Sequence, residues 1–185
     1  MRTVTYGAAS SLDGFITDRA GSVEWLHFSK DVSDFIANYW KAIDTILMGR
    51  KTWEVAAASA PPPGKRGKGR KSSATAGIKA TYVFSRTLTT IPHGDAQLVR
   101  GDAGAFVRQL KEQDGKDICV LGGGDFARSL FEAGVIDEVG FNMHPVLLGA
   151  GAPLFLDAGR RIDLQLKECR TIDGGCVLVT YRVVN

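Results

Sequence analysis

The chain has 185 residues, of which 44% are hydrophobic and 23% are charged. These values are ordinary for a soluble globular protein of one domain with a substantial core. The apolar runs are too short to cross a bilayer, and the first residues lack the apolar core of a signal peptide, so we expect a cytoplasmic protein without membrane contact.

The formal net charge of +3 comes from one short segment. Five lysines and arginines lie between residues 65 and 71, and without them the net charge falls to −2. The rest of the chain is mildly acidic and lacks the broad basic face of a nucleic-acid binder, so we expect no nucleic-acid partner. The three cysteines have no C-x-x-C spacing and the histidines share no spacing, so we expect free thiols and no metal site.

The first third of the chain contains short apolar segments around one amphipathic segment. The predicted elements are a strand at 4–9, a turn at 10–14, extended chain at 15–17, a helix from Ser29 to about residue 42, a strand at 45–48 and a helix at 50–58. Apolar side chains recur on one face of the helix that Ser29 begins, and we expect this face to pack on a core. They are Val32, Phe35, Ile36, Tyr39 and Ile43.

The rest of the chain repeats the alternation and then changes pattern. Three prolines at 61–63 stop regular structure, and we expect a mobile basic loop at about 60–78 within a single domain of residues 1–185. The later predicted elements are strands at 81–84, 97–99 and 118–121, helices at 103–113 and 125–133, and strands at 139–143, 164–169 and 176–183. The order predicts an α/β fold with a mixed, mainly parallel sheet and a C-terminal antiparallel hairpin.

Three predicted strands end in residues that suit phosphate groups. The strand at 118–121 runs into Gly122, Gly123 and Gly124, which open a helix and leave free N–H groups there. A second strand ends at Gly49, and its helix begins with Arg50, Lys51 and Thr52. A third ends in Ser85 and Arg86, a hydroxyl and a guanidinium that suit a phosphomonoester. Ligands of open α/β sheets bind beyond such carboxyl ends, so the two glycine junctions could hold one diphosphate from both sides.

Together these segments resemble a known superfamily. Residues 49–54, 84–86 and 120–124 resemble, in order and spacing, the NADPH-binding segments of dihydrofolate reductase. Residues 9–14, 132–138 and 145–149 resemble the pyrimidine reductase domain of bacterial riboflavin biosynthesis, which has the same fold. The resemblance implies a three-layer α/β/α fold of the dihydrofolate reductase type.

The resemblance also implies a cofactor and roles for particular residues. The cofactor is NADPH, bound by Ala9, Gly49, Arg50, Lys51, Thr52, Ser85, Arg86, Gly122, Gly123 and Gly124. Ser85 and Arg86 would hold the 2′-phosphate that distinguishes NADPH from NADH. The implied activity is reduction of a small heterocycle, similar to that of 5-amino-6-(5-phosphoribosylamino)uracil reductase. A homodimer is also implied, with the apolar run at 145–148 suited to its interface.

The substrate side is less defined. Asp13 and Asp31 are the candidate catalytic residues, and Asp31 and Trp25 the candidate substrate contacts. Asp31 lies in the first turn of the first helix, where dihydrofolate reductase carries its substrate-binding carboxylate, although a carboxylate there also complements the helix dipole. Leu121 stands where riboflavin reductases usually have glutamate. A pterin reductase and a non-enzymatic nucleotide-binding module therefore remain as alternatives.

Overall fold

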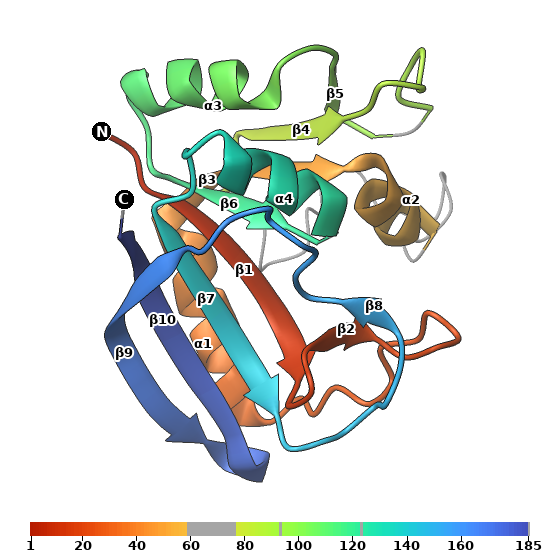
Figure 1. Cartoon of the computed structure of the whole chain (residues 1–185), viewed down its shortest axis with the longest axis vertical. Coiled ribbons are helices and arrows are strands. Elements are labelled where there is room, and N and C mark those ends of the chain that lie inside the picture. The colour runs from red at the N-terminus through yellow and green to blue at the C-terminus, as the bar shows by residue number, and fades with distance from the viewer. Residues whose placement is uncertain (59–76, 93, 123, 185) are drawn as a thin grey trace.

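The computed structural model describes residues 1–58, 77–92, 94–122, 124–184. Within these ranges one eight-stranded sheet runs through the molecule, in the order β5-β4-β3-β6-β1-β7-β10-β9 (Figure 1). Its strands are β1 (Val4–Ser11), β3 (Ile43–Gly49), β4 (Ala80–Phe84), β5 (Gln97–Val99), β6 (Asp117–Leu121), β7 (Glu138–His144), β9 (Asp163–Ile172) and β10 (Cys176–Val184). The basic loop expected at about 60–78 falls almost entirely outside the described residues.

The register confirms the predicted mixed sheet. β1 pairs in parallel with both β6 and β7, and β3 pairs in parallel with β4 and β6. β10 runs antiparallel to β7 and to β9, and the turn η2 (Asp173–Gly175) joins β9 to β10. The predicted C-terminal hairpin is therefore present. A small second sheet pairs β2 (Phe15–Thr17) with β8 (Ala152–Pro153).

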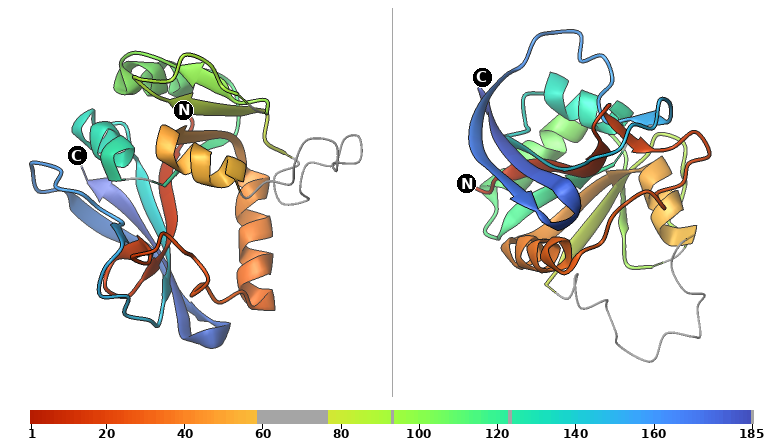
Figure 2. Two further views of the ribbon diagram at one scale, coloured as in Figure 1. Left: turned by 90° about the vertical axis from the view of Figure 1, so that its right-hand side faces the viewer. Right: turned by 90° about the horizontal axis from the view of Figure 1, so that it is seen from below.

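Helices cover both faces of the large sheet, as predicted. The helices α3 (Ala103–Glu112) and α4 (Gly124–Glu132) lie on one face, and α1 (Lys30–Ala42) and α2 (Arg50–Ala58) lie on the other (Figures 1 and 2). Gly134 follows α4 with a φ of +64°, and the N–H of Val135 donates to Leu130 O at 3.2 Å. This is the left-handed helix end that the sequence predicts. Among the described residues no helix has the length and apolar character needed to cross a membrane.

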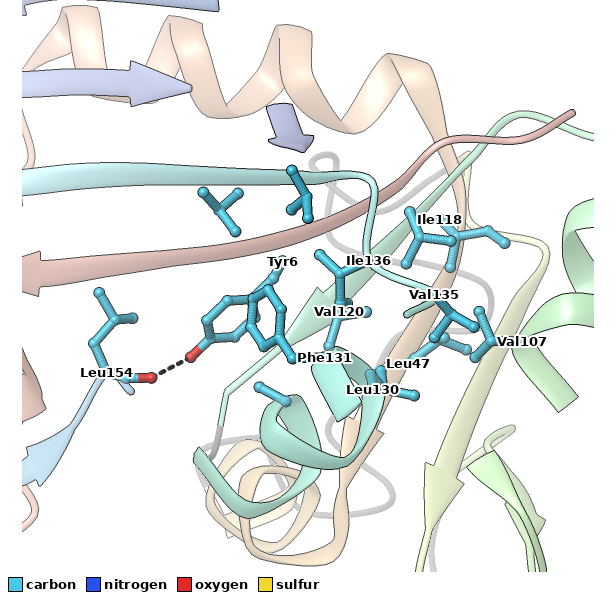
Figure 3. Close-up of a cluster of buried hydrophobic side chains, with 14 of the residues drawn as sticks. Tyr6, Leu47, Val107, Ile118, Val120, Leu130, Phe131, Val135, Ile136 and Leu154 are labelled. Atoms are coloured by element: carbon cyan, nitrogen blue, oxygen red, sulfur yellow. Dashed lines mark hydrogen bonds between the residues drawn. The ribbon is translucent and has the colours of Figure 1, made fainter. Parts of the chain in front are cut away.

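The larger hydrophobic core lies between the sheet and the helices α3 and α4. Tyr6 is fully buried at its centre and packs edge-on against Phe131 and Phe141, with ring centroids 5.9 Å apart in both cases. Its hydroxyl donates to Leu154 O at 2.6 Å (Figure 3). Hydrogen bonding satisfies this buried hydroxyl, so Tyr6 fixes the segment after β8 against the core.

The opposite face is covered less completely. Ser29 caps α1 as predicted, and its hydroxyl accepts the N–H of Val32 at 3.2 Å. Val32 is the only buried residue within α1, whereas Phe35, Ile36 and Tyr39 are half-buried. The prediction that this apolar face packs on a core is confirmed at its two ends, where Val32 and Ile43 are buried, and at Tyr39, which packs against the smaller core cluster. Between them the strands opposite carry small and polar side chains, so the same face also lines a cleft.

Candidate functional site

The carboxyl ends of three neighbouring parallel strands meet at one edge of the sheet. β3 lies between β4 and β6, and Met48 pairs with Val83 on one side and Leu121 on the other. The residues that follow these partners therefore emerge side by side (Figure 1). The structure thus brings together the three segments that the sequence identifies as suited to phosphate.

Gly122 is the point at which two of these segments touch. Its φ is +71°, in the left-handed region that glycine adopts without strain. A Cβ placed on Gly122 would lie 2.1 Å from Oγ1 of Thr52 in α2. The position therefore needs glycine both for its backbone and for its close approach to Thr52. Gly123 lies outside the described residues.

Positive side chains border this edge. Arg50 opens α2 and pairs with Glu54 one turn later at 2.8 Å, and Lys51 beside it is exposed. Arg86 is exposed just beyond the end of β4. Cations close to free helix N–H groups favour a bound anion, so the edge has the chemistry of a diphosphate site.

Ser85 shapes the turn that carries Arg86. Its hydroxyl accepts the N–H of Leu88 at 3.0 Å, and its own N–H donates to Val99 O at 3.3 Å. The bond to Val99 O brings the end of β5 next to this turn, and Arg100 is the residue that follows β5. The guanidinium of Arg100 donates to Leu88 O within the turn. Arg100 is thus a second guanidinium at the turn. The sequence did not identify it because the position of β5 in the sheet cannot be read from the chain.

A cleft of about 520 Å³ lies beside this edge, between α1 and the sheet. Ala9 and Leu121 line it, and Leu121 directly precedes Gly122. The cleft therefore opens towards the edge at which the three strand ends meet. Its wall on α1 is apolar and aromatic, formed by Val32, Phe35, Ile36, Tyr39 and Trp40.

The floor of the cleft is made of small residues. Gly7 of β1 pairs with Gly140 of β7, so two adjacent strands lack side chains at one point. The Tyr39 hydroxyl reaches down to this point and lies 3.6 Å from the position a Cβ on Gly7 would occupy. Tyr39 therefore crosses the cleft from helix to sheet.

The Tyr39 hydroxyl is buried without a hydrogen bond of ordinary geometry to any described residue. It faces the thiol of Cys119, a weak partner, and burial raises the pKa of Tyr39 far above its ordinary value. Burial likewise raises the pKa of the Cys119 thiol to about 12. Both groups therefore keep their protons at neutral pH.

His144 ends β7 at the side of the cleft. It is 3% exposed, and Trp25 packs against it edge-on with ring centroids 5.5 Å apart. Its Nδ1 accepts the backbone N–H of His27 at 3.2 Å, and its Nε2 lies 3.1 Å from the amide nitrogen of Asn142. Burial, and then the nearby His27, lower the pKa of His144, so the ring is neutral at pH 7.

The far end of the cleft is acidic. Lys167 is the only lysine or arginine among the described lining residues, and it pairs with Glu138. Asp117 and Glu168 line the cleft as well. Within the described residues no cluster of three or more histidine, cysteine or acidic side chains is arranged to hold a metal ion.

The two predicted catalytic carboxylates lie outside this cleft. Asp13 accepts hydrogen bonds from Ser11 Oγ at 2.6 Å and from the N–H groups of Leu148 at 3.1 Å and Gly149 at 2.8 Å. The Ser11 bond first, and then these backbone bonds, lower the pKa of Asp13. A carboxylate held ionised by three donors is a poor proton donor, so its geometry supports anchoring of the 145–149 segment instead.

The predicted substrate contacts are only partly placed at the cleft. Asp31 is exposed in the first turn of α1 and does not line the cleft. Its position in the first turn fits the helix-dipole alternative, and its role as a substrate contact stays a prediction. Trp25 touches the site indirectly, because it packs on His144 while its indole N–H donates to Ser22 O at 3.2 Å.

Sequence reasoning missed Tyr39, Asn142 and His144 as site residues. One signal was present in the chain. β7 alternates apolar residues with Glu138, Gly140, Asn142 and His144, although it lies inside the sheet and not at its edge. A polar face on an internal strand indicates that something other than a helix covers it.

Comparisons with known proteins agree with this geometry. The protein YyaP of Bacillus subtilis (strain 168), which is described as uncharacterized, is 33% identical over 180 residues, covering 97% of this chain and 94% of YyaP. The structure of a pyrimidine reductase-like protein from Corynebacterium diphtheriae matches with a TM-score of 0.72 at 15% identity, covering 100% of this chain and 92% of that one. Dihydrofolate reductase from Enterococcus faecalis, complexed with NADP(H), matches with a TM-score of 0.65 at 16% identity, covering 99% and 97%.

These structures share the fold of the chain, which is that of dihydrofolate reductase. A model of the RibD C-terminal domain matches residues 2–178, nearly the whole chain. The chain therefore belongs to the RibD C-terminal domain family, a family of reductases.

Proposed function

We propose that this protein is an NADPH-dependent reductase of a small heterocyclic substrate. The observation that carries the proposal is the alignment of three phosphate-suited strand ends beside a cleft of about 520 Å³. A nucleotide that lies along this edge has its reactive end at the mouth of the cleft. Membership of a reductase family supports the same activity.

The residues present fit an NADPH molecule. Gly122 lets the backbone approach a diphosphate closely, and Thr52 beside it offers a hydroxyl. Arg86 and Arg100 flank the turn after β4, where two guanidinium groups suit the 2′-phosphate of NADPH. When bound, the cofactor supplies a hydride, and the protein orients the acceptor and excludes water from it.

The cleft favours a neutral or cationic heterocycle over a phosphorylated one. Its described lining has one lysine, which is already paired, against three carboxylates. An anionic phosphoribosyl chain would meet this acidic end unfavourably. The substrate of riboflavin reductases, 5-amino-6-(5-phosphoribosylamino)uracil, is the second candidate, because the family match favours it.

The first test of this proposal is cofactor binding, measured as a thermal shift with NADPH and with NADH. We expect both to stabilise the native protein and NADPH to bind more tightly. Replacing Arg86 by alanine removes a charge-assisted contact and should weaken NADPH about tenfold while changing NADH less than about twofold. The control is Arg161→Ala, since Arg161 is exposed just before β9, outside the edge and the cleft.

The second test is NADPH oxidation with three substrates: dihydrofolate, the phosphoribosyl pyrimidine and the same pyrimidine without its phosphate. We expect the unphosphorylated ring to have the highest kcat/KM. A protein that neither cofactor stabilises is not a reductase of this type. Cofactor binding without turnover of any ring would favour the non-enzymatic binding module.

A further inference from the structure

Two buried side-chain polar atoms have no hydrogen bond of ordinary geometry in the described part of the chain, and both belong to residues that line the cleft. They are the Tyr39 hydroxyl oxygen and the Asn142 amide oxygen. An orphaned buried polar group is unfavourable, so native proteins seldom keep one without a use. Two such atoms on residues that line one cleft indicate that a bound ligand supplies the missing hydrogen bonds.

The proton on His144 decides what Asn142 offers to a ligand. The backbone N–H of His27 is always a donor, so His144 Nδ1, which accepts it, carries a lone pair. The Cys176 thiol, with its sulfur 3.4 Å from the same nitrogen, can donate weakly to this lone pair. A neutral ring of this kind carries its proton on Nε2.

The Nε2–H group of His144 faces the Asn142 amide at 3.1 Å and needs an acceptor. The amide nitrogen cannot accept, whereas the amide oxygen can. Amide oxygen and nitrogen exchange places by a half-turn about the last side-chain torsion, and the hydrogen bonds decide between the two orientations. When Asn142 Oδ1 accepts the Nε2–H of His144, the two donors no longer face each other and the amide oxygen gains a partner. The amide nitrogen then occupies the position that lacks a partner, so the N–H groups of Asn142 are the ones left to donate to a ligand.

Tyr39 also offers a donor. Its hydroxyl stays protonated because burial opposes ionisation, and the facing Cys119 thiol is a weak partner. Asn142 pairs with Ala9, and the Tyr39 hydroxyl lies above Gly7, two residues earlier on the same strand. The two donors therefore meet the same face of the sheet, on the floor of the cleft.

We propose that Asn142, oriented by His144, and Tyr39 recognise two hydrogen-bond acceptors on the ring of the substrate. A ring with two carbonyl oxygens, or with one carbonyl and one ring nitrogen, has this chemistry. The apolar wall on α1 covers the rest of such a ring. Asn142 and Tyr39 are then specificity residues and His144 is a positioning residue. The inference rests on the proposed function of the cleft.

The test uses two isosteric substitutions with matched controls. Asn142→Asp keeps an acceptor for His144 but removes the N–H donor, and Tyr39→Phe removes the hydroxyl. Asn38→Asp and Tyr82→Phe make the same changes outside the cleft, on the exposed side of α1 and in the opposite core. The probes are 5,6-diaminouracil and 7,8-dihydropterin, with binding followed by calorimetry in the presence and absence of NADPH.

We expect each cleft substitution to weaken probe binding about five- to tenfold and each control to change it less than about twofold. Long-range ¹H–¹⁵N spectra should show His144 neutral with its proton on Nε2. Equal binding by all four variants, a proton on Nδ1, or binding of neither probe by the native protein would overturn the inference. NADPH affinity measured on the same samples separates this failure from failure of the reductase proposal, because only the latter abolishes cofactor binding.

Discussion

The contact between Gly122 and Thr52 gives the sharpest quantitative prediction. Gly122→Ala forces a residue with a side chain into a left-handed conformation, which costs about 1–2 kcal/mol. The new Cβ also lies 2.1 Å from Thr52 Oγ1 and 2.8 Å from its Cβ, so α2 or the strand end must shift. Overpacking of this kind costs about 1–3 kcal/mol, and the total is about 2–5 kcal/mol.

Gly134→Ala is the matched control for this substitution. Its φ is +64°, but a Cβ there meets nothing within 4 Å. It should therefore cost only the conformational part, about 1–2 kcal/mol. Urea unfolding measures both variants, and Gly122→Ala should also weaken NADPH while Gly134→Ala leaves it unchanged. Adding Thr52→Ala should recover part of the stability of Gly122→Ala, since it removes the two closest atoms.

A loss in the free energy of unfolding that is no larger for Gly122→Ala than for Gly134→Ala would contradict this prediction. So would a Thr52→Ala substitution that adds its own cost without any recovery, because two residues that do not touch behave additively. Either result would mean that Gly122 at the end of β6 and Thr52 of α2 are not in contact. The diphosphate site would then lose its main support.

Three further substitutions test other parts of the account. Arg100→Ala should weaken NADPH about three- to tenfold and leave NADH nearly unchanged, as measured by calorimetry, because it removes a guanidinium from the turn after β4. Asp13→Asn should weaken the dependence of the free energy of unfolding on pH at acid pH and leave cofactor affinity unchanged. The pKa of Asp13 is lowered in the fold, so the ionised carboxylate stabilises the protein at neutral pH, and this stabilisation is lost as the pH falls through that pKa. Asp44→Ala should destabilise the protein by about 3–5 kcal/mol in urea, because it leaves the buried Arg2 guanidinium without its carboxylate.

The fold was predictable because its signals are local. Apolar strands followed by glycine and by amphipathic helices determine an α/β order, and the glycines at 174 and 175 mark the C-terminal hairpin. The meeting of the three phosphate-suited strand ends was predictable for the same reason, since each strand end carries its own motif. Arg100 was missed because its neighbour is fixed by strand order, which is not local.

The cleft was harder to predict for a physical reason. The stripe that includes Phe35 and Tyr39 has the spacing of a core-facing helix, and nothing in its sequence says that the opposite strands carry Gly7 and Gly140. Only pairing of β1 with β7 reveals the missing side chains. Asp13 and Asp31 were chosen by residue type and resemblance, whereas the structure places both outside the cleft. The homodimer expected through residues 145–148 stays a prediction. Leu147 in this run is 70% exposed in the single chain, which is compatible with a role at an interface.

The most direct test of the central claim is a crystal structure of the protein grown with NADPH. The account predicts a diphosphate against Gly122 and Thr52, a 2′-phosphate between Arg86 and Arg100, and a nicotinamide beside Ala9 at the mouth of the cleft. A cofactor bound away from the ends of β3, β4 and β6, or no bound cofactor at saturating NADPH, would contradict it.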